Sequence, residues 1–285
     1  MTAYKKAVVM VVLGGVFLST LGVGTRLMEA ASGLQIVFYR ALGLAVFSSL
    51  LLWYQSGTRF FAAMKEAGWP GFVAGIFLAL SSIAVVLAVL NTTVANAMFV
   101  ISLAPLLSGL FAWMLLGEKV KARTWIAIGI ALVGVLVIIN GALSTEGMLG
   151  IAYAFLMAIS YGLFTVSLRF GKDLNMLPCV CWSAYMLLLI LGVSLPSLDV
   201  PTQDIGISLT LGVFQIGLGS ILLIAGSKYV PAAQLTLLAM LEVVLSPIWV
   251  WLVVNETPSM AALIGGGIIM CAICYDALAP TKQNA

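Results

Sequence analysis

The chain has 285 residues, of which 63% are apolar and only 8% carry a charge. A soluble protein of this length exposes far more polar surface, so the composition excludes a soluble globular protein. The net charge is only +3 and no basic cluster is interleaved with aromatic residues, so nucleic acid is not expected as a partner. We therefore expect the lipid bilayer to be the solvent for most of the chain.

Ten apolar runs, separated by charged, glycine or proline residues, follow one another along the chain. In chain order they cover residues 7–25, 35–54, 71–90, 95–116, 124–140, 149–168, 178–195, 205–227, 233–254 and 259–275. Each approaches the ~20 residues that a helix needs to cross a hydrocarbon core of roughly 30 Å. We therefore predict an all-α, multi-pass membrane protein with ten transmembrane helices, located in the cell inner (plasma) membrane.

Basic residues lie almost entirely at one end of these predicted helices. The end that holds the N-terminus carries Lys5, Lys6, Arg59, Lys65, Lys119, Lys121, Arg123, Arg169, Lys172, Lys228 and Lys282. Only Arg26 falls at the opposite end, and Arg40 lies within the second run. Because basic loops tend to stay in the cytoplasm, this bias predicts that both termini are cytoplasmic.

Two stretches of the chain match when one is shifted by 138 residues. They are ANAMFVISLAPLLSGLFAWMLLGE at 95–118 and AQLTLLAMLEVVLSPIWVWLVVNE at 233–256. The shift pairs the fourth run with the ninth and the fifth with the tenth. The repeat unit is therefore five helices, residues 1–145 and 146–285 of one integral membrane domain. An odd number of helices inverts the second repeat, and inverted repeats are typical of secondary transporters, whose site lies near the midplane between the halves.

Four motifs, taken in chain order, carry a resemblance to a known family. They are FYRALGLAV (38–46), LAPLLSGLFAWMLLGE (103–118), GIAYAFLMAISYGLFTVSLR (150–169) and LEVVLSPIWVWLVVNE (241–256). The set resembles the drug/metabolite transporter (DMT) superfamily and, within it, the ten-helix EamA-type carriers. Val243 stands where the family often has proline, and Asn255 where glycine is usual. The resemblance implies transport of small organic metabolites, often as export coupled to protons or to an exchanged solute, and amino acid exporters belong to this superfamily.

Glu242 lies close to the middle of the ninth run. A charged side chain at the centre of a membrane helix costs about 2.5–3.5 kcal/mol on insertion scales, and intramembrane acids commonly mark substrate or proton pathways. One interpretation is that Glu242 couples transport to a proton or binds a substrate amine. The other is that a protonated Glu242 makes a structural hydrogen bond to a neighbouring helix.

Arg40 is the second charge within a predicted helix. At ~1.5 Å per residue it lies about 8 Å below the outer surface, and Glu242 lies about 14 Å above the inner surface. In a core of roughly 30 Å their depths differ by less than about 10 Å, so the side chains can meet if the helices are neighbours. An ion pair between the halves, formed and broken during transport, is one hypothesis. The alternative is that Arg40 extends to the outer interface.

Further polar and aromatic residues within the predicted helices complete a candidate substrate or coupling site. Besides Glu242 and Arg40, the set contains Tyr39, Asn96, Gln234, Gln215, Tyr161, Trp182, Tyr185 and Trp249. An apolar pocket with a few convergent polar groups suits an amphipathic solute, such as an amino acid-like metabolite. For the aromatic residues, the alternative is packing or a place in the interface belt.

The sequence also bears on other functions and partners. Histidine is absent and no catalytic or phosphate-binding motif occurs, so an enzyme is a remote alternative and no catalytic residue, cofactor or metal site is expected. An uptake carrier or a channel-like facilitator for a small organic solute stays an alternative to an exporter, because no feature fixes the direction of transport. The glycines of the fifth and tenth runs are expected to form packing surfaces, with contacts between the protomers of a homodimer as one option.

Overall fold

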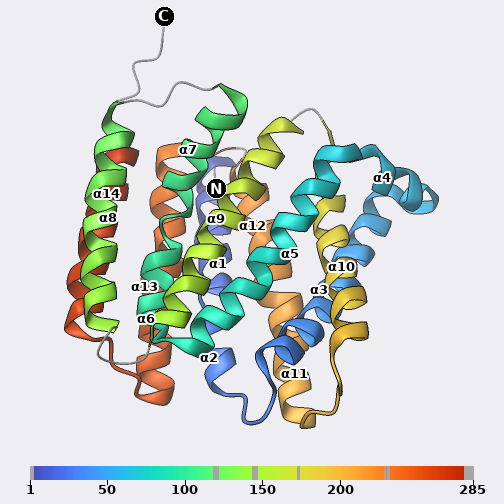
Figure 1. The fold of residues 1–285 in the computed structure, drawn as a ribbon. Helices are drawn as coiled ribbons and strands as arrows, with labels where there is room; N and C mark the ends of the chain where they lie inside the picture. The colour runs from blue at the N-terminus through green and yellow to red at the C-terminus, as the bar shows by residue number, and fades with distance from the viewer. Residues whose placement is uncertain are drawn as a thin grey trace, which may run out of the picture.

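The computed structural model describes residues 3–117, 122–142, 147–171, 174–227, 229 and 232–278. Every regular element that it describes is helical (Figure 1). Among the residues named above, Glu118 and the lysines 119, 121, 172, 228 and 282 lie outside the described residues. The predicted repeat boundary between residues 145 and 146 also borders undescribed chain and stays a prediction.

The described helices group into ten spans. In chain order they are α1 (Ala3–Leu18) with α2 (Leu21–Arg26), α3 (Gly33–Ser56), α5 (Gly68–Asn91), α6 (Val94–Ile101) with α7 (Ala104–Leu116), α8 (Ala122–Ala142), α9 (Met148–Phe170), α10 (Pro178–Ser194), α11 (Thr202–Thr210) with η2 (Leu211–Leu218) and α12 (Gly219–Ser227), α13 (Ala232–Val254) and α14 (Met260–Leu278). Within the described chain, seven stretches are long and apolar enough to cross a membrane, and three further apolar helices are shorter. The predicted all-α fold with ten spans is confirmed.

The two halves run in opposite directions through the bundle. In Figure 1, α7 ends at the top of the view, whereas its repeat counterpart α13 ends at the bottom. We call the end of the bundle that carries the loops 27–32, 92–93, 195–201 and 255–259 the lower end, and the opposite end the upper end. The inverted arrangement inferred from the 138-residue shift is therefore confirmed, with five spans in each half.

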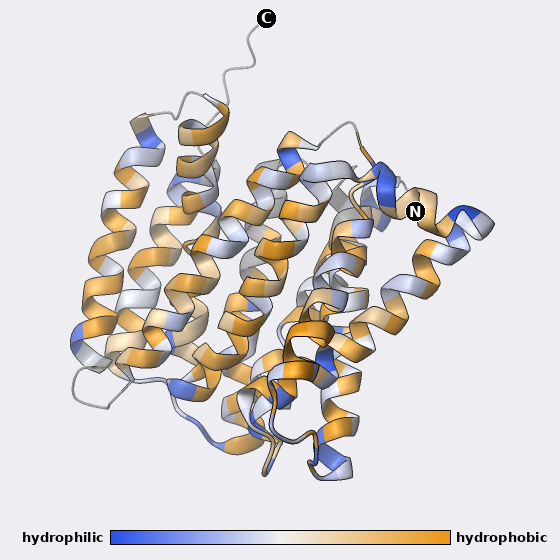
Figure 2. Ribbon diagram, turned by 45° about the vertical axis from the view of Figure 1, so that its right-hand side comes forward, coloured by the Kyte–Doolittle hydropathy of each residue, from blue (hydrophilic) through white to orange (hydrophobic). Residues whose placement is uncertain are grey.

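The hydrophobic exterior follows from the solvent. Figure 2 shows hydrophobic residues along the length of the helices and hydrophilic residues mainly at their ends. Large apolar side chains stay exposed midway along the outer helices, with Leu136 63% and Leu189 71% accessible. In water such a surface would aggregate, but against acyl chains it is the lowest-energy boundary.

Glycines let the fifth and tenth spans cross in backbone contact. A Cβ atom on Gly134 of α8 would lie 2.6 Å from the carbonyl oxygen of Gly265, and a Cβ on Gly265 would lie 2.5 Å from that of Gly134. Only hydrogen side chains allow this approach, which is how small residues join membrane helices. The packing surface expected at these glycines therefore joins the two halves of one chain. The homodimer stays a prediction.

Three spans are interrupted near their middle. The first breaks at Ser19–Thr20, where the Ser19 and Thr20 hydroxyls each donate 2.7 Å bonds to carbonyl oxygens of the preceding turn, those of Val16 and Phe17. The fourth breaks at Ser102–Leu103, because Pro105 has no N–H to give to the carbonyl of Ile101. The eighth widens into the π-helical segment η2, a rare conformation often found at functional sites.

Candidate functional site

Arg40 is buried between the two halves and is hydrogen-bonded to both. Its side chain projects from α3 and is only 3% exposed. Nε and Nη2 donate to Oε1 of Gln215 at 3.2 Å and 3.0 Å, and Nη1 donates to the hydroxyl of Ser82 on α5 at 2.9 Å. Arg40 therefore does not extend to an interface, and both side chains that hold it are neutral.

The backbone around Gln215 brings its side chain within hydrogen-bond distance of Arg40. It lies in η2, and its Nε2 donates to the carbonyl oxygen of Leu18, 3.2 Å away, where α1 ends. Two glycines bring the backbones of span two and span eight together. A Cβ on Gly43 would lie 2.5 Å from the carbonyl oxygen of Leu209, and a Cβ on Gly212 would collide with the carbonyl of Arg40. The break in span one and the π-segment of span eight thus meet at a single side chain.

Glu242 faces the interior of the bundle. On α13 the exposed positions include Val244, Ile248 and Trp251, which share one face. At 100° per residue, Glu242 points about 160° away from Val244, yet it stays partly accessible. Within the described residues it has no hydrogen-bond donor and no cation within 4.0 Å, although its charge interacts with that of Arg40 over a longer distance.

Tyr161 borders the same interior space from α9. The lipid-facing stripe of this helix contains Leu149, Leu156 and Ile159. Tyr161 lies about 120–160° around the helix from all three, and yet 38% of it is exposed. Tyr161 therefore lies on the side of α9 that faces away from the lipid-facing stripe, although it stays accessible.

Trp249 connects this region to the break in span one. It lies seven residues after Glu242, about 20° away around α13. Its indole Nε1 donates to the hydroxyl of Ser19 at 2.9 Å, and that hydroxyl donates to the carbonyl of Val16. Glu242 and Trp249 therefore present a carboxylate and an aromatic face on one side of α13.

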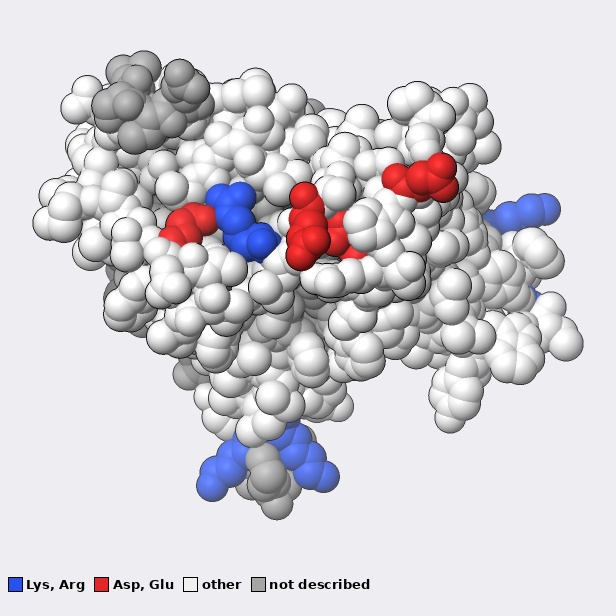
Figure 3. All heavy atoms as spheres, turned by 90° about the horizontal axis from the view of Figure 1, so that it is seen from below, with Lys and Arg blue, Asp and Glu red and all other residues white. Residues whose placement is uncertain are grey.

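At the lower end, polar contacts tie the two halves together. Arg26 pairs with Glu256 at 2.7 Å and also donates to the carbonyl oxygen of Thr92, and Glu256 accepts from the backbone N–H of Val94. Asp204, only 1% exposed, accepts from the backbone N–H groups of residues 29, 30 and 31 at 2.9–3.2 Å. On the face seen from below, acidic side chains accordingly lie beside a basic one (Figure 3). These contacts hold the two halves together at the lower end.

The EamA-like transporter family matches the chain twice, over residues 5–140 and over residues 148–275. The chain belongs to this family. The predicted resemblance to the EamA-type carriers is thereby confirmed, and transport is the activity for which this family is named.

Individual relatives agree with this assignment. The chain is 28% identical over 195 residues to the uncharacterized transporter YdfC of Bacillus subtilis (strain 168), covering 66% of this chain and 64% of YdfC. It is 24% identical over 187 residues to an uncharacterized transporter of Clostridium kluyveri, covering 61% of this chain and 60% of that protein. The chain thus covers less than two thirds of the length of either relative. A solved crystal structure with 19% identity shares the fold, with a TM-score of 0.68 over 96% of this chain and 97% of that one.

Several predicted site residues of this EamA-like transporter lie apart from the Arg40 network. The Tyr39 hydroxyl donates to the carbonyl of Leu198 at the lower end, 2.7 Å away. Trp182 packs edge-on to Phe72, with ring centroids 5.6 Å apart. The Tyr185 hydroxyl lies 2.6 Å from that of Ser49. These contacts are with helices α3 and α5 and with the lower loops.

Of the two repeat-related amides, Asn96 has a described side chain and Gln234 does not. Asn96 is 4% exposed, and its Nδ2 donates to the Thr92 hydroxyl at 3.2 Å, whereas its Oδ1 has no partner in the described part of the chain. Gln234 lies in α13, but its side chain is outside the described residues. The assignment of both to a substrate site stays a prediction.

Sequence reasoning did not single out Ser82, Ser19 or the carbonyl of Leu18, all of which hold network residues. Serine is common in membrane helices, so neither serine stood out. The Leu18 carbonyl became available only through a helix break that carries no proline. Within the described residues, no group of three or more metal-ligating side chains is found.

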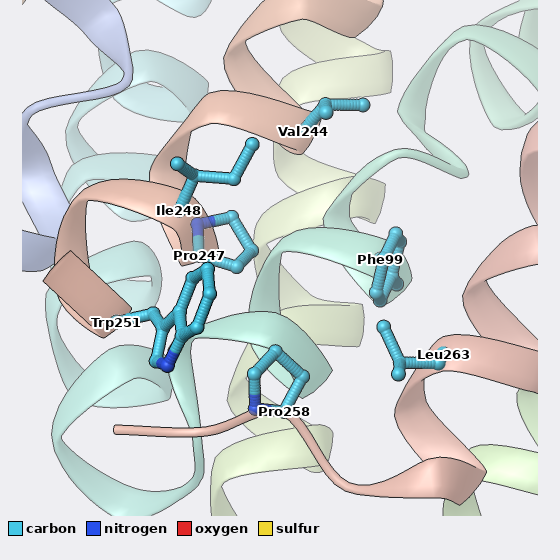
Figure 4. Close-up of a pocket in the computed structure, with 7 residues that line it drawn as sticks. All are labelled: Phe99, Val244, Pro247, Ile248, Trp251, Pro258 and Leu263. Atoms are coloured by element: carbon cyan, nitrogen blue, oxygen red, sulfur yellow. The ribbon is translucent and has the colours of Figure 1, made fainter. Parts of the chain in front are cut away.

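An apolar pocket of about 250 Å³ lies elsewhere in the transporter. Phe99, Pro247, Trp251, Pro258 and Leu263 are among the residues that line it (Figure 4). It opens on the face of α13 that carries Val244 and Ile248, opposite to Glu242. Because the lining of this pocket is apolar apart from the indole of Trp251, the Arg40–Glu242 region is the better candidate site.

Proposed function

We propose that this EamA-like protein is a secondary active transporter that moves a small amphipathic metabolite, such as an amino acid-like solute, by alternating access. The solute binds between the halves, beside Glu242, Tyr161 and Trp249. Export across the cell inner membrane, with both termini cytoplasmic, is the proposed direction, and coupling is to protons or to an exchanged solute. These details go beyond what family membership establishes.

One observation carries the proposal. Glu242 lies midway along α13, it is partly exposed although it points away from the lipid-facing side of that helix, and no described residue donates a hydrogen bond to it. A carboxylate is costly to keep in that position without a partner. An ammonium group or a proton that arrives by the transport path supplies the missing partner.

The surroundings of Glu242 favour an amphipathic solute. Tyr161 and Trp249 offer aromatic surface, and Trp249 lies on the same side of α13 as the carboxylate, about 10 Å along the helix, which suits an apolar moiety or a cation. Arg40 lies close enough for its charge to interact with that of Glu242. A solute that carries an amine and a carboxylate therefore finds complementary charges in one cavity.

The contacts between the two halves at the lower end are consistent with alternating access. In an inverted-repeat carrier, contacts between the halves close one end of the path while the other end opens. The Arg26–Glu256 pair and the Asp204 contacts join the halves at the lower end. We interpret them as contacts that close this end in one of the two states.

The test starts from purified protein and a thermal-shift screen against a metabolite library, which identifies a stabilising solute. Counterflow of that solute is then measured in liposomes for the wild type, for Glu242→Gln and for the control Glu66→Gln at the exposed upper end. We expect saturable counterflow in the wild type and the control, and a loss of at least about tenfold in Glu242→Gln. Counterflow in Glu242→Gln equal to wild type would remove Glu242 from the site. Uptake without counterflow in all three proteins would favour the channel-like facilitator instead.

A further inference from the structure

The Arg40 guanidinium and the Glu242 carboxylate do not form an ion pair, although both lie within the bundle. They are further apart than 4.0 Å, yet close enough for their charges to interact. Opposite charges attract strongly where the dielectric constant is low, by several kcal/mol at short range. A buried arginine has a long side chain, so some other contact must hold its guanidinium away from the carboxylate.

Gln215 is that contact. Its Oε1 accepts two of the N–H groups of Arg40, from Nε at 3.2 Å and from Nη2 at 3.0 Å. Ser82 accepts only one, from Nη1. Two donors converging on one oxygen fix both the position and the plane of the guanidinium, which a single hydroxyl cannot do.

The orientation of the Gln215 amide is set by its two neighbours. Arg40 can only donate, so it requires Oε1, and the carbonyl of Leu18 can only accept, so it requires Nε2. The reversed amide would place donors against donors and an acceptor against an acceptor. The break at the end of α1 therefore locks the amide that holds Arg40.

We propose that Gln215 is a positioning residue that keeps the Arg40 guanidinium off Glu242, so that the carboxylate stays free for the solute. The inference rests on the proposed function in assigning the solute to Glu242. It adds that the selectivity of this site for a cation or a proton depends on a neutral amide one helix away. Without that amide, Arg40 moves to Glu242 and occupies it.

Among the described residues, few titratable groups interact with this pair. From α3 the group is Arg40 itself, and from α9 it is the phenol of Tyr161, which is neutral at pH 7. Gln215 and Ser82, from η2 and α5, are neutral. The accessibility of Glu242 therefore reports mainly on where the Arg40 guanidinium lies.

The test measures the reactivity of Glu242 with dicyclohexylcarbodiimide, an apolar reagent that modifies protonated carboxyl groups in membranes. Modification at Glu242 is quantified by peptide mass spectrometry on full-length protein in liposomes, for wild type and Gln215→Leu. Gln203→Leu is the control, because Gln203 lies on the same span but donates to the carbonyl of Leu27 at the lower end. We expect about tenfold slower modification in Gln215→Leu, the change that one ion pair worth about 1.4 kcal/mol produces, and no change in Gln203→Leu.

Two further variants separate positioning from a structural role. In Gln215→Leu/Arg40→Met the competing cation is gone, so modification of Glu242 should return to within about twofold of wild type. In Gln215→Glu the new carboxylate pairs with Arg40, although it can no longer donate to the carbonyl of Leu18, so modification should not fall below wild type even if Gln215→Leu fails to fold. Unchanged modification in Gln215→Leu, slow modification in the double variant, or slow modification in Gln215→Glu would each overturn the proposal. None of these readouts needs transport, so a failed counterflow assay is distinguishable from a failed positioning role.

Discussion

At the residue scale, Arg40, Gln215 and Asp204 all lie in hydrogen-bond networks, because a lone polar group within the bilayer is costly, and Glu242 is the exception on which the proposed function rests. Asp204 illustrates this at the lower end. It sits at the start of α11 and receives three backbone N–H groups from the loop that follows α2. Because Asp204 is almost completely buried, its carboxylate depends on these three donors for its hydrogen bonds.

Asp204→Asn should therefore destabilise the fold. Asparagine has one acceptor oxygen, and its NH₂ group would face backbone N–H donors. We expect a loss of about 1–3 kcal/mol in unfolding free energy, seen as a lower thermal midpoint in detergent. Asp199→Asn is the matched control, because Asp199 is exposed and none of the described contacts involves its carboxylate. Equal midpoints for the two variants would contradict a structural role for the Asp204 carboxylate.

Residue types inside the apolar runs could be read from the sequence, but their partners could not. Arg40, Gln215 and Glu242 were predicted as candidates because each is polar in an apolar run. The Arg40–Glu242 ion pair, one of two hypotheses for Arg40, is not formed in this structure, since Gln215 and Ser82 hold the guanidinium instead. Choosing between Glu242 and Gln215 as the partner of Arg40 requires knowing that η2 crosses α3 in backbone contact, which depends on tertiary structure.

At the element scale, the spans followed from hydropathy because the bilayer imposes a length on every crossing helix. The interruptions of spans one and eight could not be predicted from hydropathy. Pro105 predicts a break in the fourth span, but Ser19–Thr20 carries neither proline nor glycine, and η2 depends on packing against α3 and α1. The short helices η1 (Gly57–Arg59) and α4 (Phe60–Glu66) were missed because they are too short to show a membrane pattern.

The close crossing of α8 and α14 can be tested by replacing one of its glycines. Gly265→Ala places a Cβ 2.5 Å from the Gly134 carbonyl, so the helices must separate or shift, at a cost of about 1–3 kcal/mol. Gly267→Ala is the control, because nothing lies within 4 Å of a Cβ at that position. We expect a lower thermal midpoint only for Gly265→Ala. A drop of the same size in Gly267→Ala would show that the effect is not due to the crossing.

At the scale of the whole molecule, the inverted repeat could be recognised from a 138-residue shift, and the family match over both halves agrees with it. The side of the membrane on which the termini lie stays a prediction from the loop charges. The substrate and the direction of transport also stay proposals, because they depend on conformational energies that neither the hydropathy nor one structure contains.

The central claim is that Tyr161 and Glu242 line a water-accessible path between the halves, whereas equally exposed residues of the same helix face lipid. Tyr161 and Ile159 are both 38% exposed and lie two positions apart on α9. Each is replaced by cysteine in a background without the four native cysteines. The reaction with a charged, water-soluble methanethiosulfonate reagent is then followed in liposomes. We predict rapid labelling of Tyr161→Cys, slowed by the solute found in the screen, and no labelling of Ile159→Cys. Labelling of Ile159→Cys as fast as Tyr161→Cys, or no labelling of either, would contradict the account.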